Sequence, residues 1–179
     1  EVFSFMQSSV SSEKPKKIVI HEIAKEMTMI RGRGGKIVVV AGPAIIHSGA
    51  GPYLGALIRD GFVDVLLGGN ALAVHDVESA MYSTSLGVHL ESARPVEGGH
   101  RHHMRAINAV RQLGSLSAAV DAGLLTRGVM YEAVRKGIPM VLAGSIRDDG
   151  PMPDVITDVV RAQSAMRDAI QGADLVLMI

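Results

Sequence analysis

The sequence predicts an α/β protein with an open, doubly wound parallel sheet, and three observations support this fold class. Four short runs of mainly apolar residues recur along the chain, each continuous rather than alternating, as in strands that are buried on both faces. Segments with helical spacing separate the runs, which is the order of a parallel sheet with crossover helices. Glycine directly follows each of the first three runs, where a strand has to turn towards a helix.

The chain begins with a polar, serine-rich stretch, and Pro15 then suits the first turn of a helix. We expect residues 1–35 to be a leader and a helix of a preceding subdomain, and residues 36–179 to form the α/β domain. The chain starts with Glu1 rather than Met and stops within an apolar run, so we also expect a piece of a longer protein that is truncated at its C-terminus. The apolar stripe of the first helix consists of Ile18, Ile23, Met27 and Ile30.

The elements of the domain follow from the same periodicities. Strands are expected at residues 36–41, 62–67, 138–143 and 174–179. Helices are expected between them, at residues 52–59, 70–83, 101–113, 115–120 and 126–136. Ser115 and Thr126 are the expected N-caps of the fourth and fifth of these helices. A final helix is expected to start at a cap by Asp154 and to end at Gly172, and residues 84–100 are expected to form a loop.

The composition excludes several kinds of partner and site. Lys and Arg total 18 and so do Asp and Glu, so a nucleic-acid-binding surface is not expected, and 3 Phe, 3 Tyr and no Trp cannot form a base-stacking platform. The absence of Cys excludes disulfides and thiolate metal sites, and it fits the reducing cytoplasm, which is the expected localisation. The longest apolar stretch, residues 37–46, is shorter than the about 18 residues of a membrane span, so no membrane partner is expected.

Ligands of open parallel sheets bind beyond the carboxyl ends of the strands, so the loops after the first three strands form the candidate site. The first loop has glycines, a Ser and a His before a helix, and the backbone N–H groups of such a loop can cradle a pyrophosphate. A tight turn between strand and helix explains the same glycines equally well. The candidate cofactor-binding residues of this loop are Gly42, Pro43, His47, Ser48 and Gly49.

The second loop supplies three further candidates for cofactor binding, Gly69, Asn70 and Ala71. Glycine lets a cofactor approach the backbone. The amide of Asn70 can both donate to and accept from a ribose hydroxyl or a carboxamide. The alternative is that Asn70 is only the N-cap of the helix that follows.

His75 and Asp76 are the candidate proton-transfer pair, a base with an orienting carboxylate. Glu78 lies three residues after His75, on the same face of the predicted helix. The alternative is a solvated face with no catalytic task. A further cluster of histidines, within residues 100–103, lacks the four-residue spacing of helical metal ligands, so no metal is expected.

The third loop places a cation and two anions after a buried strand. Arg147 could clamp a carboxylate or a phosphate, and Asp148 or Asp149 could bind a ribose hydroxyl or an ammonium group. Ser145 is a further candidate cofactor contact at the start of this loop. The alternative is a turn stabilised by local pairing.

Four long, non-repetitive segments carry a family resemblance: VVVAGPAIIHSGAG, LLGGNALAVHDVESAMYSTSLGV, GGHRHHMRAIN and VLAGSIRDDGPMPDVITDV. In this order they resemble the family called LOR/SDH bifunctional enzyme conserved region. That family includes archaeal ornithine cyclodeaminases and the C-terminal part of cyanobacterial arginine dihydrolases. The resemblance covers residues 11–179 and implies a Rossmann-like, NAD-binding domain. It implies binding roles for Asn70, Ala71 and one of Asp148 and Asp149.

The resemblance implies that the parent protein is an NAD-dependent ornithine cyclodeaminase, which converts ornithine into proline and ammonia with internally recycled hydride. The chemistry of the side chains, rather than the resemblance, suggests that Arg147 holds the substrate carboxylate and that His75 with Asp76 moves protons. A TMLH-type loop and a V-D-I-N-type strand end of the family are absent from this chain. The alternatives are an NAD-dependent dehydrogenase of the lysine or saccharopine type, and a non-catalytic NAD-sensing module. The sequence leaves open whether the protein is a homo-oligomer.

Overall fold

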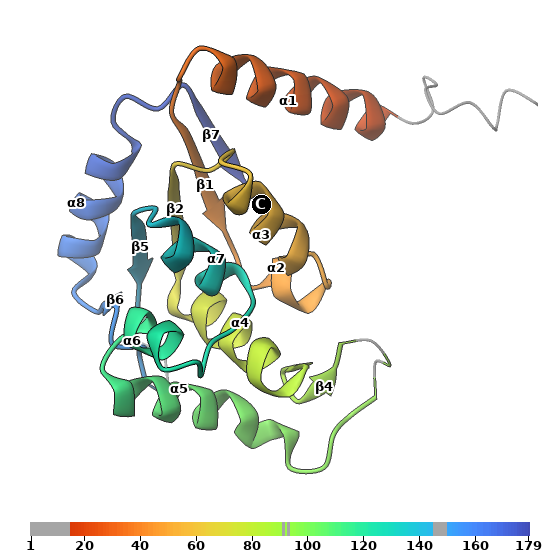
Figure 1. Cartoon of the computed structure of the whole chain (residues 1–179), viewed down its shortest axis with the longest axis vertical. Helices are drawn as coiled ribbons and strands as arrows, with labels where there is room; N and C mark the ends of the chain where they lie inside the picture. Colours follow the sequence, from red (N-terminus) through yellow and green to blue (C-terminus); the bar gives the residue numbers. More distant parts are fainter. Residues whose placement is uncertain (1–14, 91, 93, 145–149) are drawn as a thin grey trace, which may run out of the picture.

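The computed structural model describes residues 15–90, 92, 94–144 and 150–179, and it contains a five-stranded parallel sheet (Figure 1). The order of the strands is β6-β5-β2-β1-β7. Every neighbouring pair in it is parallel, so the predicted α/β fold with a parallel sheet is confirmed. The strands are β1 (Ile37–Ala41), β2 (Val65–Gly69), β5 (Met140–Ala143), β6 (Val155–Ile156) and β7 (Leu175–Met178).

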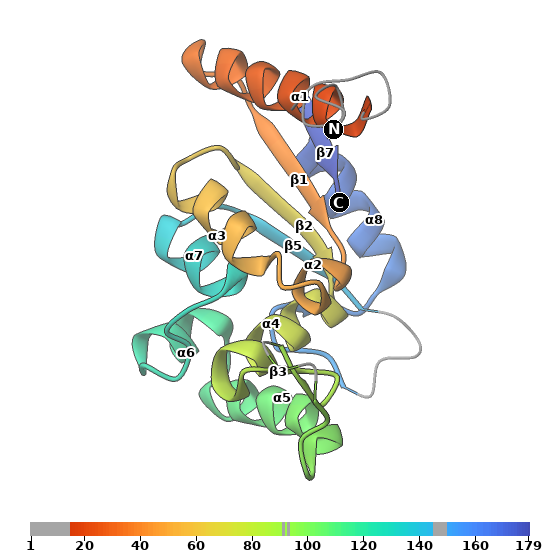
Figure 2. The same cartoon turned by 90° about the vertical axis from the view of Figure 1, so that its right-hand side faces the viewer.

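Helices cover both faces of the sheet, as the doubly wound arrangement requires. Figure 2 shows α3 and α7 on one side of the strands and α8 on the other. None of the helices in the described part of the chain is long and apolar enough to cross a membrane. The helices are α1 (Pro15–Gly32), α2 (Ala44–His47), α3 (Gly51–Arg59), α4 (Asn70–Tyr82), α5 (His102–Leu113), α6 (Leu116–Asp121), α7 (Val129–Lys136) and α8 (Val159–Ile170), with a 3₁₀ turn at Gly99–Arg101.

The continuous β-branched run of β1 is explained by burial on both faces. Val39 packs into the larger core cluster with the helices of one face, including Ile58 of α3 and Met130 of α7. Val38, one residue earlier, points to the opposite face and packs against Met166 of α8. Successive side chains of a strand point to opposite faces, so both faces need apolar residues.

The stripe predicted for α1 is confirmed at its C-terminal half. Met27 and Ile30 are buried and form a small cluster with Ile37, the first residue of β1. The strand β2 begins at Val65, three residues later than predicted. Asp64 explains this start, because its carboxylate accepts a hydrogen bond from the backbone N–H of Ile37 at 2.8 Å and thus belongs to the turn that enters the sheet.

The prediction for the last helix was wrong at its start. Asp158 caps α8, since its side chain accepts a hydrogen bond from the backbone N–H of Arg161 at 2.9 Å. Asp154 instead accepts from the backbone N–H of Leu116 at 2.8 Å, at the start of α6. The residues just after Asp154 form β6, an edge strand that pairs with β5.

The segment 84–100, expected to be a loop, contains a small hairpin. Its strands are β3 (Thr84–Ser85) and β4 (Val88–His89), which pair antiparallel. The two turn residues between them, Leu86 and Gly87, both have positive φ, at 53° and 74°. Such a two-residue turn matches the twist of a hairpin, but it strains a leucine.

Candidate functional site

The candidate site is a hollow of about 580 Å³ at the carboxyl ends of four strands, β1, β2, β5 and β7. This is the place at which open parallel sheets bind ligands. The hollow has a mainly apolar lining and a volume typical of small-molecule sites. Its lining residues are Val40, Ala41, Gly42, Gly68, Gly69, Ala143, Met166, Met178 and Ile179.

The three glycines of the hollow are present for different reasons. A Cβ atom on Gly68 would lie 2.7 Å from Cδ2 of Leu72, so close packing of α4 onto β2 explains that glycine. A Cβ atom on Gly42 or on Gly69 would meet nothing closer than 3.8 Å, and neither residue has a positive φ. Neither backbone conformation nor packing within the described chain therefore requires glycine at these two positions, and both border the hollow.

Asn70 does not cap its own helix, so that alternative was wrong. The N-cap of α4 is Gly69, without a side-chain hydrogen bond. The buried amide of Asn70 instead accepts from the backbone N–H of Met152 at 2.9 Å and donates to the carbonyl of Gly150 at 3.3 Å. Asn70 thus ties the start of α4 to the segment that follows β5. Its neighbour Ala71 is half-buried.

The residues predicted in the first loop do not all lie at the hollow. Among them only Gly42 lines the hollow. Pro43 is the N-cap of α2, Ser48 donates from its hydroxyl to the carbonyl of Ile45 at 3.2 Å, and Gly49 has a φ of 77° in the turn between α2 and α3. The tight turn therefore accounts for Ser48 and Gly49. The residues predicted in the third loop, Ser145, Arg147, Asp148 and Asp149, lie outside the described residues.

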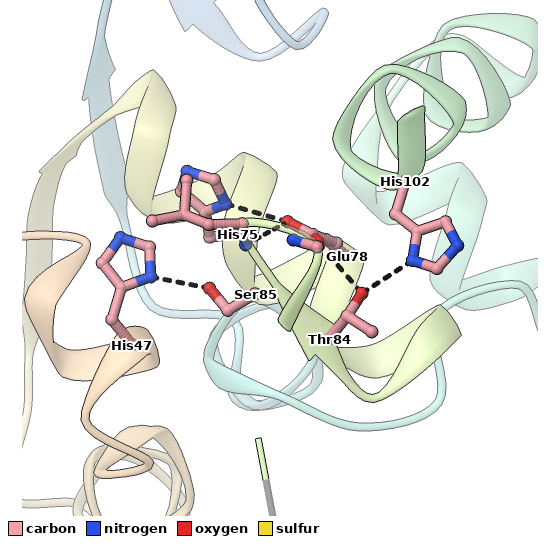
Figure 3. A network of polar contacts seen from close by, with 8 residues as sticks. His47, His75, Glu78, Thr84, Ser85 and His102 are labelled. Atoms are coloured by element: carbon pink, nitrogen blue, oxygen red, sulfur yellow. Dashed lines mark hydrogen bonds and ion pairs between the residues drawn. The ribbon is translucent and has the colours of Figure 1, made fainter. Parts of the chain in front are cut away.

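A second polar cluster, the histidine network, lies beside the start of the hairpin (Figure 3). Glu78 is fully buried at its centre. Its carboxylate pairs with Nδ1 of His75 at 2.9 Å and accepts from the hydroxyl of Thr84 at 3.0 Å. That hydroxyl also contacts Nδ1 of His102 at 2.8 Å, and His102 stacks on Tyr82 with ring centroids 4.5 Å apart.

The same carboxylate holds the hairpin turn. Both oxygens of Glu78 are used, because the backbone N–H groups of Leu86 and Gly87 donate to them at 3.3 and 3.2 Å. Burial would raise the pKa of Glu78, but the hydrogen bonds from His75, Gly87 and Thr84 outweigh it, so the pKa of this carboxyl lies below its usual value. Glu78 is therefore ionised at neutral pH.

His47 forms the outer edge of the network. Its Nδ1 lies 2.6 Å from the hydroxyl of Ser85, and its ring packs edge-on against His75 with centroids 4.7 Å apart (Figure 3). The residue is exposed, although its ring is partly covered. Partial burial lowers the pKa of His47, and the neighbouring His75 lowers it further, while Glu78 offsets part of the effect.

Asp76 has a different task from the one predicted. Its buried carboxylate accepts from the backbone N–H groups of Val129 and Met130 at 2.9 and 2.7 Å, so it caps α7 from a neighbouring helix. Thr126, the expected cap of that helix, lies outside it. Burial raises the pKa of Asp76 to about 6 although these two hydrogen bonds oppose the shift. The carboxylate that orients His75 is Glu78.

Sequence reasoning missed Thr84 and Ser85, because both fall in a segment expected to be a loop and neither has a distinctive neighbour in sequence. The pairing of His75 with Glu78 had a signal, the three-residue spacing that places two side chains on one helix face. Among residues 15–90, 92, 94–144 and 150–179, no group of three or more His, Asp or Glu side chains could hold a metal ion.

A family model described as "Arginine dihydrolase ArgZ-like, C-terminal, Rossmann fold" matches residues 21–179. An ornithine cyclodeaminase of Methanocaldococcus jannaschii is 59% identical over 99% of this chain and 43% of its own length. The bifunctional arginine dihydrolase/ornithine cyclodeaminase ArgZ of a Synechocystis species is 54% identical over 99% of this chain and 25% of its own length. The crystal structure of AgrE in ternary complex with ornithine and NAD⁺ matches 95% of this chain and 25% of that chain, with 51% identity and a TM-score of 0.90. The chain thus spans less than half the length of these relatives.

Proposed function

Since the chain belongs to the ArgZ-like family of C-terminal Rossmann domains, as its sequence segments predicted, we propose that it is part of an NAD-dependent ornithine cyclodeaminase. The relatives that are named for this activity, and the solved relative that holds ornithine and NAD⁺, support the proposal. The chain would contribute much of the cofactor site, and the remainder would come from parts of the protein that it does not include.

The observation that carries the proposal is the pair of unexplained glycines at the hollow. Gly42 directly follows β1 and Gly69 is the last residue of β2, where a dinucleotide lies across the sheet in proteins of this fold. Packing within the chain does not explain why both positions lack a side chain. A cofactor bound against the backbone would explain it. The apolar lining fits flat rings, and the N-terminus of α4 beside Gly69 offers backbone N–H groups to a phosphate. The described residues therefore fit NAD.

Other residues would shape the site around the cofactor. Asn70 fixes the segment after β5 through Gly150 and Met152, so it would position the loop that carries Asp148 and Asp149. One of these two aspartates is the proposed ribose contact. Arg147, in the same loop, is the proposed holder of the substrate carboxylate, because a guanidinium can bind both carboxylate oxygens.

The cofactor supplies a hydride acceptor for the amine-bearing carbon of ornithine and later a hydride donor, so no net NAD is consumed. The chain's own residues would hold the substrate and move its protons. His75 is the proposed base, since its ring is oriented by a buried carboxylate and its side chain keeps 13% of its surface exposed.

The test is to incubate the full-length protein with ornithine and NAD⁺ and to measure proline, ammonia and net NADH. The proposal predicts equal amounts of proline and ammonia without accumulation of NADH. Accumulating NADH would instead indicate an amino-acid dehydrogenase. Tight NAD binding without turnover of any amino acid would indicate a sensing module.

A further inference from the structure

We propose that His75 and His47 form a proton path between the substrate amine and solvent, with Glu78 as the residue that positions His75. This inference rests on the proposed cyclodeaminase. Cyclisation needs such a path, because the amine that closes the ring enters as an ammonium ion. It must lose a proton before it can attack, and the departing nitrogen must gain one.

The directions of the hydrogen bonds that lead to Glu78 follow from its ionised state. A carboxylate only accepts, so Nδ1 of His75 must carry the hydrogen of their 2.9 Å contact. The basic nitrogen of neutral His75 is therefore Nε2. This atom has no hydrogen-bond partner among the described residues. It is not one of the buried nitrogens that lack a partner, so it can accept a proton from a substrate.

A series of hydrogen bonds, all donated towards Glu78, holds its carboxylate in place. The hydroxyl of Thr84 gives its single hydrogen to Glu78 at 3.0 Å, so it can only accept from Nδ1 of His102 at 2.8 Å. The backbone N–H groups of Leu86 and Gly87 add two further donors from the hairpin turn. Four groups thus donate hydrogen bonds to the buried carboxylate of Glu78, and His102 donates to one of these four, the hydroxyl of Thr84. The arrangement orients His75 far more rigidly than a single surface pair would.

Neither histidine lines the hollow, but each lies on a helix that follows one of its glycines along the chain. His47 ends α2, the helix that follows Gly42, and His75 lies in α4, the helix that follows Gly69. Each histidine is therefore within two turns of a glycine that borders the hollow. The rise along α4 from Asn70 to His75 is about 7.5 Å, at 1.5 Å per residue.

The two rings differ in exposure, which gives the path its direction. His75 is mostly covered, whereas His47 is exposed, and the rings touch with centroids 4.7 Å apart. A second positive charge at this distance is unfavourable, and His75 accordingly lowers the pKa of His47. The polar side chains that contact the pair are Glu78 of α4 and Ser85 of β3. Thr84 of β3 contacts Glu78, and His102 of α5 contacts Thr84.

The proposed step transfers only protons. The N–H bond of the substrate ammonium breaks as an N–H bond forms at Nε2 of His75, which leaves a neutral amine and an imidazolium. The imidazolium then passes a proton, directly or through one water, to His47, which releases it to solvent. The reverse transfer protonates the nitrogen that leaves as ammonia. Nothing is oxidised or reduced in this step.

The test compares three variants of the full-length enzyme: His47→Gln, Glu78→Gln and the control His21→Gln, which alters an exposed histidine of α1. We expect His47→Gln to lower kcat at least about tenfold while NAD binding is retained, and added imidazole to restore most of the loss. The control should match the wild type with and without imidazole. Glu78→Gln should lower kcat more than it changes the KM for ornithine and should alter the pH profile.

His47→Gln keeps the proposal testable if loss of Glu78 prevents folding. A folded His47→Gln enzyme with wild-type kcat, or one whose loss imidazole does not restore, would overturn the path. A wild-type enzyme that makes no proline would overturn the proposed function and the substrate end of the path with it. The contact between the rings is tested apart from activity by NMR titration of labelled histidines. The pKa of His47 should rise in His75→Gln, and an unchanged value would overturn the coupling.

Discussion

Replacing Gly42 with Ala tests whether a cofactor, rather than the fold, requires glycine at the hollow. The added methyl would lie 3.8 Å from the carbonyl of Ile179, an ordinary contact, and the backbone has no positive φ. Loss of glycine flexibility in the unfolded chain should make the variant slightly more stable, by about 0.4–1 kcal/mol. The same methyl forced into the contact with a bound ligand costs about 1–3 kcal/mol, which corresponds to about a 5- to 150-fold loss of affinity.

Gly68→Ala is the matched control. Its methyl would lie 2.7 Å from Cδ2 of Leu72 and 3.3 Å from the carbonyl of Ala41, so overpacking should destabilise the fold by about 1–3 kcal/mol. Titration calorimetry with NAD⁺ and denaturant unfolding, both on the full-length protein, separate the two effects. If Gly42→Ala binds NAD⁺ as tightly as the wild type does, or loses stability as Gly68→Ala does, the assignment of Gly42 to the cofactor is refuted.

Three further predictions concern residues whose tasks the structure revised. Burial raises the pKa of Asp76 from 3.8 to about 6. Between pH 3.8 and about 6, Asp76 therefore keeps its proton in the folded protein but loses it in the unfolded chain. The stability contributed by this group should therefore fall as the pH rises through that window, and urea unfolding of Asp76→Asn should not show this fall. Asn70→Asp places an oxygen against the carbonyl of Gly150 and should destabilise the protein by about 1–3 kcal/mol and weaken NAD⁺ binding, measured by calorimetry. Asp154→Ala should cost about 1 kcal/mol and speed hydrogen exchange at the amide of Leu116, whereas exchange in α8 should not change.

Each of these predictions has an outcome that contradicts it. Equal pH dependence in wild type and Asp76→Asn would mean that the buried carboxyl does not titrate in this range. An Asn70→Asp protein as stable as the wild type would mean that the hydrogen bond from Asn70 to Gly150 does not stabilise the fold. Faster exchange at the start of α8 in Asp154→Ala would restore the cap that the sequence predicted.

The sequence predicted the strands well where burial on both faces imposed a continuous apolar run, as in β1. It did not predict β6, because Val155 and Ile156 also fit the spacing of the helix that follows. Only pairing with Leu142 and Ala143 makes these two residues a strand, and this pairing depends on tertiary structure. Helix caps were likewise predictable only when they are local in sequence. Ser115 caps its own helix and was predicted, whereas Asp76, which caps α7, lies 53 residues before Val129.

The hollow lies where the sequence placed the candidate site, but the contacts that its residues make within the fold were not predictable. The rule that ligands bind beyond the carboxyl ends of strands located the hollow. The sequence could not separate Gly68, which Leu72 requires, from Gly69, which nothing in the described chain requires. For His75, adjacent residues on a helix point about 100° apart, so spacing alone favoured Glu78 over Asp76 as its partner.

The most direct test of the central claim follows deuterium through the reaction. The full-length protein is given ornithine deuterated at both amine-bearing carbons, with NAD⁺ far below the substrate concentration. If the cofactor recycles hydride within one site, mass spectrometry should find proline that retains all of its deuterium, in amounts well above the NAD⁺ supplied. Proline that has lost deuterium, or product limited to the amount of NAD⁺, would contradict an NAD-dependent cyclodeaminase.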